Sequence, residues 1–162
     1  MQTVTATVPV RPGAVALLRR ACDGLDRLSP VADLAVRLWV ASVFWKSGIS
    51  KAQSLDTTVQ LFRYEYSVPL LPPELAAYLG TSVELVFPVL LAVGMAGRFA
   101  ALVLFAFNVI AVIAYPDLGP AGVEQHYVWG ILLLVTLLHG PGRLSADHLI
   151  GRWLARKGAP PR

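Results

Sequence analysis

Glu84 is the residue around which chemistry in this sequence would be organised. It lies within an apolar run from Leu75 to Met95 that is long enough to cross a bilayer. An ionisable side chain near the centre of such a segment is costly, and it indicates a functional site that needs a partner. Pro88 follows four residues later and has no N–H, so the backbone carbonyl of Glu84 loses its usual helical donor. Both the side chain and the backbone of Glu84 therefore need partners within the membrane.

Depth within the membrane suggests which side chains can meet Glu84. A helix rises about 1.5 Å per residue, which places Glu84 roughly 18 Å and Lys46 roughly 22 Å from the arginine-rich ends of their predicted spans. Asn108 and His126 lie at roughly 15 and 20 Å by the same count. Lys46 is therefore the favoured partner of Glu84, and Lys51, nearer the outer rim, stays an alternative. Asn108 and His126 come within reach if their helices face the same interior.

Three roles for this polar layer stay open. The first is a buried ion pair that fixes the register of the helices, and the second is a pocket for a small ligand such as a quinone headgroup or an organic acid. The third is a path for protons or ions. Aromatic residues in the outer half, among them Phe44, Trp45 and Trp129, suit a pocket. They equally suit the aromatic belt found at membrane interfaces.

Other site chemistries find no support in the sequence. The single cysteine, Cys22, excludes an internal disulfide and a CxxC redox pair. His126 and His139 lie roughly 20 Å apart on one predicted helix, so they would sit at opposite membrane surfaces. With His148 as the third histidine, no metal or bis-histidine haem site is expected. Because signatures such as GxSxG, the P-loop and HExxH are missing from the sequence, we do not expect a complete enzyme in this chain alone.

The composition is that of an integral membrane protein. The chain has 162 residues, of which 56% are hydrophobic and 15% charged, and its mean hydropathy is +0.60. The net charge of +4 comes mostly from arginines near the two ends. In a soluble protein this charge would suggest nucleic acid, but beside long apolar runs it indicates topogenic charges against anionic lipid. We therefore expect a lipid bilayer, and no nucleic acid, as a partner.

The apolar runs predict four membrane-spanning helices. They are expected at about 31–53, 74–96, 99–115 and 123–139. The connecting segment 54–73 is long enough to contain a short helix or a flap over the bundle. Lysines and arginines gather at both chain ends and at Arg98, whereas the two longer loops carry mainly acids, so both termini are expected in the cytoplasm.

Shorter helices are expected at both ends of the chain. Residues 13–29 predict a short amphipathic helix in the membrane interface, with a partly ordered basic tail as the alternative. Gly140-Pro141-Gly142 ends the last span, and Ser145 is expected to cap an amphipathic helix over 146–157. The fold class is therefore all-α, an integral membrane four-helix bundle with short amphipathic helices at the N- and C-termini. Its expected parts are 1–30, with 1–12 disordered, the four-helix domain 31–142 and a cytoplasmic tail 143–162.

Several residues and short motifs follow one another in a set order along these spans. The series reads Arg37, Phe44-x-x-x-Gly48-x-x-Lys51, Glu84, Gly94-x-x-x-Arg98, Glu124 and Gly140-Pro141-Gly142-x-x-Ser145-x-Asp147. Over about residues 33–148, this series resembles the DoxX family of small four-helix bacterial membrane proteins. Its order and spacing carry the resemblance, since no single motif is specific. The family pattern favours Lys51 as the partner of Glu84, whereas depth favours Lys46, and both are kept.

Depth within the membrane and the family pattern together give two expected groups of residues. Pro88 and Lys46 depart from the family pattern, and Pro88 could kink its helix beside Glu84. Asp33 and Arg37 are expected to pair near the cytoplasmic end. The expected polar or ligand-binding cluster comprises Glu84, Lys46, Lys51, Asn108, His126 and Arg37. The expected structural residues are Gly48, Pro88, Arg98, Gly140, Pro141, Ser145 and Asp147.

Family relatives include the membrane subunit of thiosulfate:quinone oxidoreductase, and others are described as membrane partners in redox-stress or sulfur-handling complexes. The resemblance thus implies a bacterial inner-membrane protein that acts as the membrane subunit of an oxidoreductase assembly. It implies no intrinsic cofactor, quinone as the candidate ligand near Glu84, and a protein partner subunit, with a homo-oligomer also compatible. The alternatives are a small-solute permease that uses the Glu84–lysine site, and a scaffold that recruits a soluble partner.

Overall fold

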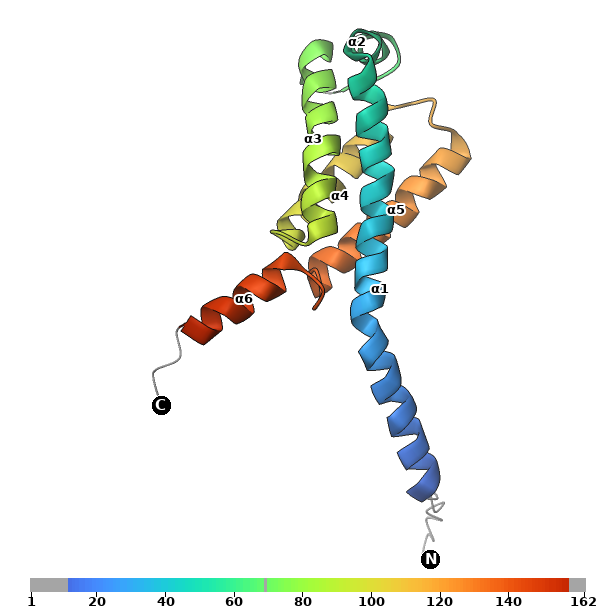
Figure 1. Ribbon diagram of the computed structural model, residues 1–162. Helices are drawn as coiled ribbons and strands as arrows, with labels where there is room; N and C mark the ends of the chain where they lie inside the picture. Colours follow the sequence, from blue (N-terminus) through green and yellow to red (C-terminus); the bar gives the residue numbers. More distant parts are fainter. Residues whose placement is uncertain (1–11, 69, 158–162) are drawn as a thin grey trace, which may run out of the picture.

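Four long apolar runs and two short amphipathic segments form six helices (Figure 1). The computed structural model describes residues 12–68 and 70–157. No strand occurs among these described residues, which confirms the all-α fold class. Four of the helices, α1, α3, α4 and α5, are long and apolar enough to cross a membrane. The helices are α1 (Pro12–Gln53), α2 (Leu55–Tyr64), α3 (Pro73–Val93), α4 (Gly97–Ala114), α5 (Gly119–His139) and α6 (Ala146–Lys157).

The four long helices pack around a small apolar core. α1 lies along α3, α4 packs against α5, and α3 contacts α4. Val40, Leu91, Leu104 and Leu133 are almost fully buried in this core. Many apolar side chains on the same helices point outward instead, and Ile113 is 65% exposed. Such a surface needs lipid around it, because contiguous exposed apolar area of this extent is not stable in water.

The N-terminal amphipathic segment is helical, as expected, but it is part of α1 and not a separate helix in the interface. Pro30 lies inside α1 and removes the hydrogen bond to the carbonyl of Asp26. Asp26 is exposed, so water can satisfy that carbonyl and the helix continues. α1 therefore projects beyond the bundle (Figure 1). Residues 1–11 of the expected tail lie outside the described residues.

The segment between the first two spans contains a short helix, one of the two outcomes expected for it. α2 lies across the end of the bundle opposite α6, which we call the α2 end (Figure 1). Phe62 is buried against Ala76 and Ala77 of α3. The backbone N–H of Ser67 donates to the carbonyl of Ala114 at 2.7 Å, which ties the following loop to α4. This segment therefore covers the α2 end of the bundle.

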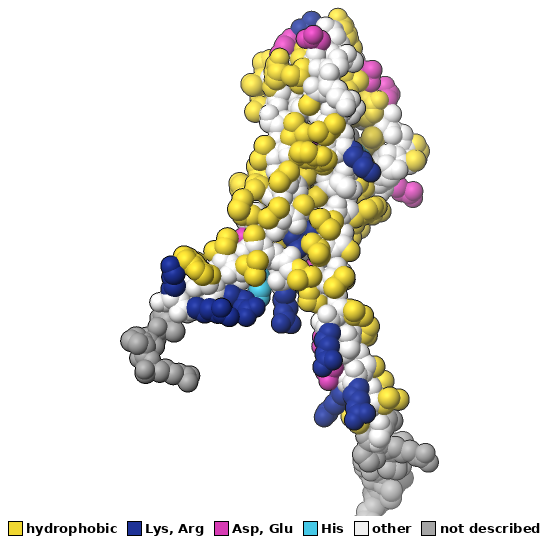
Figure 2. Space-filling model, in the orientation of Figure 1, with side chains coloured by type: hydrophobic (Ala, Val, Ile, Leu, Met, Phe, Trp, Pro, Cys, Tyr) yellow, Lys and Arg dark blue, Asp and Glu magenta, His cyan; other side chains and the backbone are white. Residues whose placement is uncertain are grey.

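α6 has the expected bounds, and its first turn is capped as expected. The Ser145 Oγ accepts a hydrogen bond from the backbone N–H of His148 at 3.2 Å. α6 extends sideways from the bundle, and we call this end the α6 end (Figure 1). Lysines and arginines gather here and acidic side chains gather at the α2 end (Figure 2). Residues 158–162 of the expected tail lie outside the described residues.

Candidate functional site

Lys51 of α1 and Glu84 of α3 form a buried ion pair. The Lys51 Nζ lies 2.7 Å from Oε1 and 2.6 Å from Oε2 of Glu84. It also donates to the Ser47 Oγ at 3.1 Å. The exposed fractions of the two side chains are 15% for Lys51 and 5% for Glu84. The three ammonium protons of Lys51 are therefore all used by Ser47 and Glu84.

Lys46 takes no part in this pair, so the depth-based expectation is wrong. Lys46 is exposed on the outer surface of α1. Lys51 is five residues further on, which places it roughly 140° around the helix axis from Lys46. Depth says nothing about which side of a helix faces the bundle, and the family pattern identified the correct lysine. Lys46 is a lipid-facing or interfacial cation.

Gly48 allows α1 and α3 to approach at Glu84. A Cβ at position 48 would lie 2.9 Å from both the backbone carbon and the backbone oxygen of Glu84. This is the same carbonyl that Pro88 leaves without its helical donor. The carbonyl instead faces the Cα of Gly48, where a weak C–H···O contact can form. Pro88 is fully buried, and α3 continues through it to Val93.

Gly48→Ala is expected to lower the free energy of unfolding by about 1–3 kcal/mol, because the new Cβ would meet backbone atoms that cannot rotate away. Gly24→Ala is the matched control, since it lies in the same helix with open space around it. That control is expected to be neutral or stabilising by up to roughly 1 kcal/mol. Unfolding of the purified protein in mixed micelles measures both values. Equal effects of the two substitutions would contradict this close approach.

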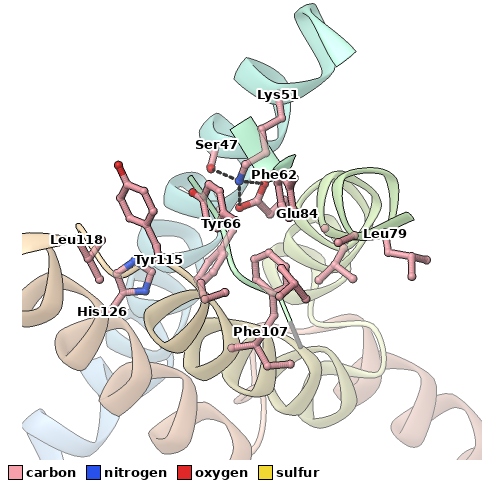
Figure 3. Close-up of a pocket in the computed structure, with 18 of the residues that line it drawn as sticks. Ser47, Lys51, Phe62, Tyr66, Leu79, Glu84, Phe107, Tyr115, Leu118 and His126 are labelled. Atoms are coloured by element: carbon pink, nitrogen blue, oxygen red, sulfur yellow. Dashed lines mark hydrogen bonds and ion pairs between the residues drawn. The ribbon is translucent and has the colours of Figure 1, made fainter. Parts of the chain in front are cut away.

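A cavity of about 290 Å³ adjoins the ion pair at the α2 end. Its walls come from α1, α2, α3, α4 and α5, and from the loop after α2 (Figure 3). Most of the lining is apolar or aromatic, including Phe62, Phe107 and Trp129. Its polar lining residues include Ser47, Lys51, Glu84 and His126. An apolar cavity with a few converging polar groups is the usual form of a small-molecule site.

Aromatic rings close the α2 end of this cavity. Tyr66 stacks on Phe62 at 4.6 Å and on Tyr115 at 4.8 Å, measured between ring centroids. The Tyr115 hydroxyl contacts Glu65 at 3.4 Å. Burial, aided by the nearby charge of Glu84, raises the pKa of Tyr66, so its phenol stays protonated at neutral pH. Tyr66 can therefore act as either a donor or an acceptor towards a molecule in the cavity.

The cavity wall includes apolar residues of α3, α4 and the loop after α2 that are also exposed on the surface of the bundle. Leu71, Leu79 and Ile110 line the cavity and are also 40%, 48% and 47% exposed. These side chains form an apolar rim on the membrane-facing surface. Towards the α6 end, by contrast, the core residues Val40 and Leu104 fill the bundle. A molecule dissolved in the bilayer can therefore reach this rim without crossing water.

Asn108 and His126 bond to each other and not directly to Glu84. The Asn108 Nδ2 donates to the backbone carbonyl of His126 at 2.9 Å, and Asn108 Oδ1 lies 2.8 Å from His126 Nδ1. Asn108 is buried between α4 and α5. His126 lines the cavity, whereas Asn108 does not. The polar layer expected from the sequence is thus divided into two pairs, and His126 faces the same cavity as Lys51 and Glu84.

Arg37 lies near the α6 end, away from this cavity, so its expected membership of the polar cluster with Glu84 is wrong. It is 1% exposed, and its guanidinium donates to the carbonyls of Leu91, Ala92 and Leu144. The expected pair with Asp33 is not formed, because Asp33 lies against Gly142. Fourteen residues of α1 separate Arg37 from Lys51, about 21 Å along the axis. Arg37 joins the last turn of α3 to the segment before α6.

Gly48 and Pro88 lie beside Glu84, whereas the other expected structural residues lie at the α6 end. Asp147 accepts hydrogen bonds from the backbone N–H groups of Ala96 and Gly97 at 2.8 and 2.9 Å. Such a carboxylate at the first turn of α4 is favoured by the exposed N–H groups and the helix dipole. The backbone N–H of Asp147 donates to the Gly94 carbonyl at 3.0 Å, and a Cβ on Gly94 would clash with Ser145. We call Arg37, Gly94, Ser145 and Asp147 the α6-end cluster.

Arg98, Gly140 and Pro141 complete the packing at this end. Pro141 lies against Gly97, where a Cβ would come within 2.6 Å of its ring. Gly140 ends α5 at a φ of 91° and lies beside the exposed Arg98. The Arg98 guanidinium donates to the Leu138 carbonyl at 3.3 Å. These residues join the end of α5 to the start of α4.

Several cavity residues could not be singled out from the sequence. Ser47 shares Lys51 with Glu84, and Tyr66 and Tyr115 close the cavity from loops. The sequence offers one signal, the alternation of aromatic and charged residues from Phe62 to Tyr66, and it concerns Tyr66 alone. Among the described residues, no group of three His, Cys, Asp or Glu side chains is placed to hold a metal ion.

Comparisons with known proteins identify relatives of this chain. A family model described as DoxX matches residues 32–116. A protein of Haemophilus influenzae (strain Rd), described as an uncharacterized protein, is 30% identical over 128 residues, which cover 75% of this chain and 85% of that protein. No solved structure matches. The family match includes Arg37, Gly48, Lys51 and Glu84 but ends before His126 and α6.

Proposed function

The chain belongs to the DoxX family, and from that premise we propose that it is the membrane subunit of a quinone-linked oxidoreductase assembly. The proposed quinone site is the cavity beside Lys51 and Glu84. The resemblance noted from the sequence supplies the class of reaction, because family relatives include a membrane subunit of a quinone-dependent oxidoreductase. The observation that carries the proposal is the exposed apolar rim of a cavity that has polar groups inside.

A quinone matches this arrangement in both of its parts. Its ring is flat and carries polar oxygens, which suits a cavity lined by Phe107 and Trp129 and ending at charged groups. Its isoprenoid tail is lipid-soluble and would leave through the apolar rim at Leu79 and Ile110. Conversion between quinone and quinol moves protons, and Glu84, Lys51 and His126 are ionisable groups that line the cavity.

A partner subunit would supply the electrons in this proposal. The chain itself offers the lipid-facing ligand site and protonatable side chains. We place the chain in the bacterial inner membrane with the α6 end in the cytoplasm, because lysines and arginines concentrate there and acids concentrate at the α2 end (Figure 2). In this orientation the quinone site lies in the outer half of the membrane. A homo-oligomer is compatible with the proposal and is not required by it.

A permease is the second candidate, supported by the pairing of a buried lysine with a buried glutamate. Transport would need the site to open towards both sides of the membrane in turn. Beneath the ion pair, however, Leu91, Leu104 and Leu133 are at most 1% exposed and fill the bundle. The exposed apolar rim of the cavity favours a membrane-dissolved ligand over a water-soluble solute.

Filling the cavity tests the quinone proposal. Ala111→Phe adds a ring at a half-buried position of the cavity wall, and Ala106→Phe adds the same ring to an exposed position of the same helix. We expect Ala111→Phe to weaken binding of a short-chain ubiquinone about tenfold or more, equivalent to at least about 1.4 kcal/mol, and Ala106→Phe to leave it unchanged. Calorimetric titration of the purified protein in detergent measures both. The proposal fails if the wild-type chain does not bind this quinone, or if the two variants bind it equally.

A further inference from the structure

We propose that the cavity distinguishes the two redox forms of its ligand and binds the hydroxyl-bearing hydroquinone in preference to the quinone. The discriminating atom is Nε2 of His126, which presents a hydrogen-bond acceptor to the cavity. This inference rests on the quinone site proposed above. It adds the form of the ligand that the site recognises and the residue that recognises it.

The orientation of the Asn108 amide fixes the proton on His126. One end of the amide lies 2.9 Å from the backbone carbonyl oxygen of His126, which can only accept a hydrogen bond. The Nδ2 of Asn108 must therefore be at that end, since the opposite orientation would place two oxygens against each other. The Oδ1 of Asn108 then lies at the other end, 2.8 Å from Nδ1 of His126. An amide oxygen also only accepts, so Nδ1 carries a proton.

A neutral imidazole with its proton on Nδ1 has a lone pair on Nε2. Among the described residues, no carboxylate is bonded to the His126 ring, so nothing there favours a second proton. The Nδ1 edge is occupied by Asn108, which does not line the cavity, whereas His126 does. The Nε2 edge is thus the one available to a molecule in the cavity. A hydroxyl group can donate to this atom, and a quinone carbonyl would meet it lone pair to lone pair.

The other polar groups that line the cavity also favour a ligand that donates hydrogen bonds. The three protons of Lys51 are committed to Ser47 and to both oxygens of Glu84, so Lys51 has none left for a quinone carbonyl. Each carboxylate oxygen of Glu84 accepts one bond from Lys51 and can accept another. The phenol of Tyr66 can donate or accept and does not discriminate (Figure 3). Acceptors therefore outnumber free donors among the charged and imidazole groups of the cavity.

Gly130 makes the arrangement at His126 possible. A Cβ at this position would lie 3.3 Å from Asn108 Nδ2, closer than most such contacts. Gly130 is four residues after His126 on α5, and it lets Asn108 of α4 reach the His126 carbonyl across the helix surface. The packing of α4 against α5 therefore determines that the proton of the neutral His126 ring is on Nδ1. A site that bonds a ligand hydroxyl in this way rejects the analogue without it, because a buried acceptor is left unpaired.

The preference can be measured with one short-chain ubiquinone in its two redox states. Under anaerobic conditions, we expect the wild-type chain to bind the quinol at least about tenfold more tightly than the quinone. His126→Phe is expected to abolish this ratio, mainly by weakening the binding of the quinol. His139→Phe, the same change at an exposed position of the same helix, is the matched control and is expected to keep the ratio.

Nitrogen NMR of the wild-type chain labelled at its histidines tests the tautomer without any question of folding. The His126 signals, assigned by their loss in His126→Phe, are expected to show a protonated Nδ1 and an unprotonated Nε2. A proton on Nε2 overturns the inference, as does equal binding of both redox forms or tighter binding of the quinone. In these cases the quinone site itself would stand. If neither form binds to the wild-type chain, the proposed function and this inference both fail.

Discussion

Replacing Lys51 by methionine is expected to lower the free energy of unfolding by about 3–5 kcal/mol, because it leaves the buried carboxylate of Glu84 without its counter-ion. Methionine keeps most of the length and volume of the side chain, so the change removes charge and hydrogen bonds more than packing. Glu84 is 5% exposed and has Lys51 as its ion-pair partner. Unfolding in mixed micelles, followed by circular dichroism, measures the difference.

Two further variants separate the charge effect from other causes. Lys46→Met removes an exposed lysine five residues away and is expected to change stability by no more than about 0.5 kcal/mol. Lys51→Met combined with Glu84→Met removes both charges and is expected to recover most of the loss, since apolar replacements of a buried pair are often tolerated. Equal losses for Lys51→Met and Lys46→Met would contradict the pairing of Lys51 with Glu84.

Infrared spectroscopy gives an independent readout of the same pair. A carboxylate buried without a partner takes up a proton to avoid the cost of an isolated charge. The band of a protonated carboxyl group is therefore expected at neutral pH in Lys51→Met, and is not expected in the wild-type chain or in the double variant. A strong protonated band in the wild-type chain that Glu84→Gln removes would exclude a permanent ion pair.

The positions of the helices could be predicted closely from the sequence, because span length and hydropathy depend on local composition. α6 was predicted to the residue, and Glu84 was expected to need a buried partner, which the structure shows to be Lys51. Depth along a helix was also predictable. The direction in which a side chain points was not, because it depends on which face of each helix meets its neighbours. That is why depth favoured Lys46, whereas packing placed Lys51 against Glu84.

Longer-range packing accounts for the other differences. Arg37 and Asp33 are correctly spaced for a pair on one helix. The Arg37 guanidinium instead donates to three backbone carbonyls that are distant in the sequence, and local spacing cannot predict such contacts. The sequence predicts separate helices on either side of Pro30, but α1 continues through it, because water can replace the lost hydrogen bond. Tyr66 and Tyr115 reach the cavity from loops, whose course depends on the finished bundle.

The residues of the family pattern occupy two separate places in the structure. Gly48, Lys51 and Glu84 meet at the cavity, whereas Arg37, Gly94, Ser145 and Asp147 form the α6-end cluster. Both places join α1 to α3, one at each end of their contact. The α6-end cluster therefore holds α1 and α3 together at a place away from the cavity. Variants at the α6-end cluster are therefore expected to lower stability and to have little effect on ligand binding.

Arg37→Met is the strongest test of this division, and it is expected to lower the free energy of unfolding by roughly 3–5 kcal/mol. The guanidinium is 1% exposed and satisfies carbonyls in the last turn of α3 and in the segment before α6. Without it, these carbonyls lose a charged donor in a place that water reaches poorly. Arg37→Lys keeps the charge but not the planar set of donors, so an intermediate loss is expected.

Arg98→Met is the matched control, because Arg98 also donates to a carbonyl near a helix end. Arg98 is exposed and its bond to Leu138 is 3.3 Å long, so the expected loss is no more than about 0.5 kcal/mol. Amide exchange adds a local readout: the Asp147 N–H, which is bonded to the Gly94 carbonyl, is expected to exchange faster in Arg37→Met than in Arg98→Met. If the two variants lose equal stability and protect this amide equally, Arg37 does not hold α3 to the segment before α6.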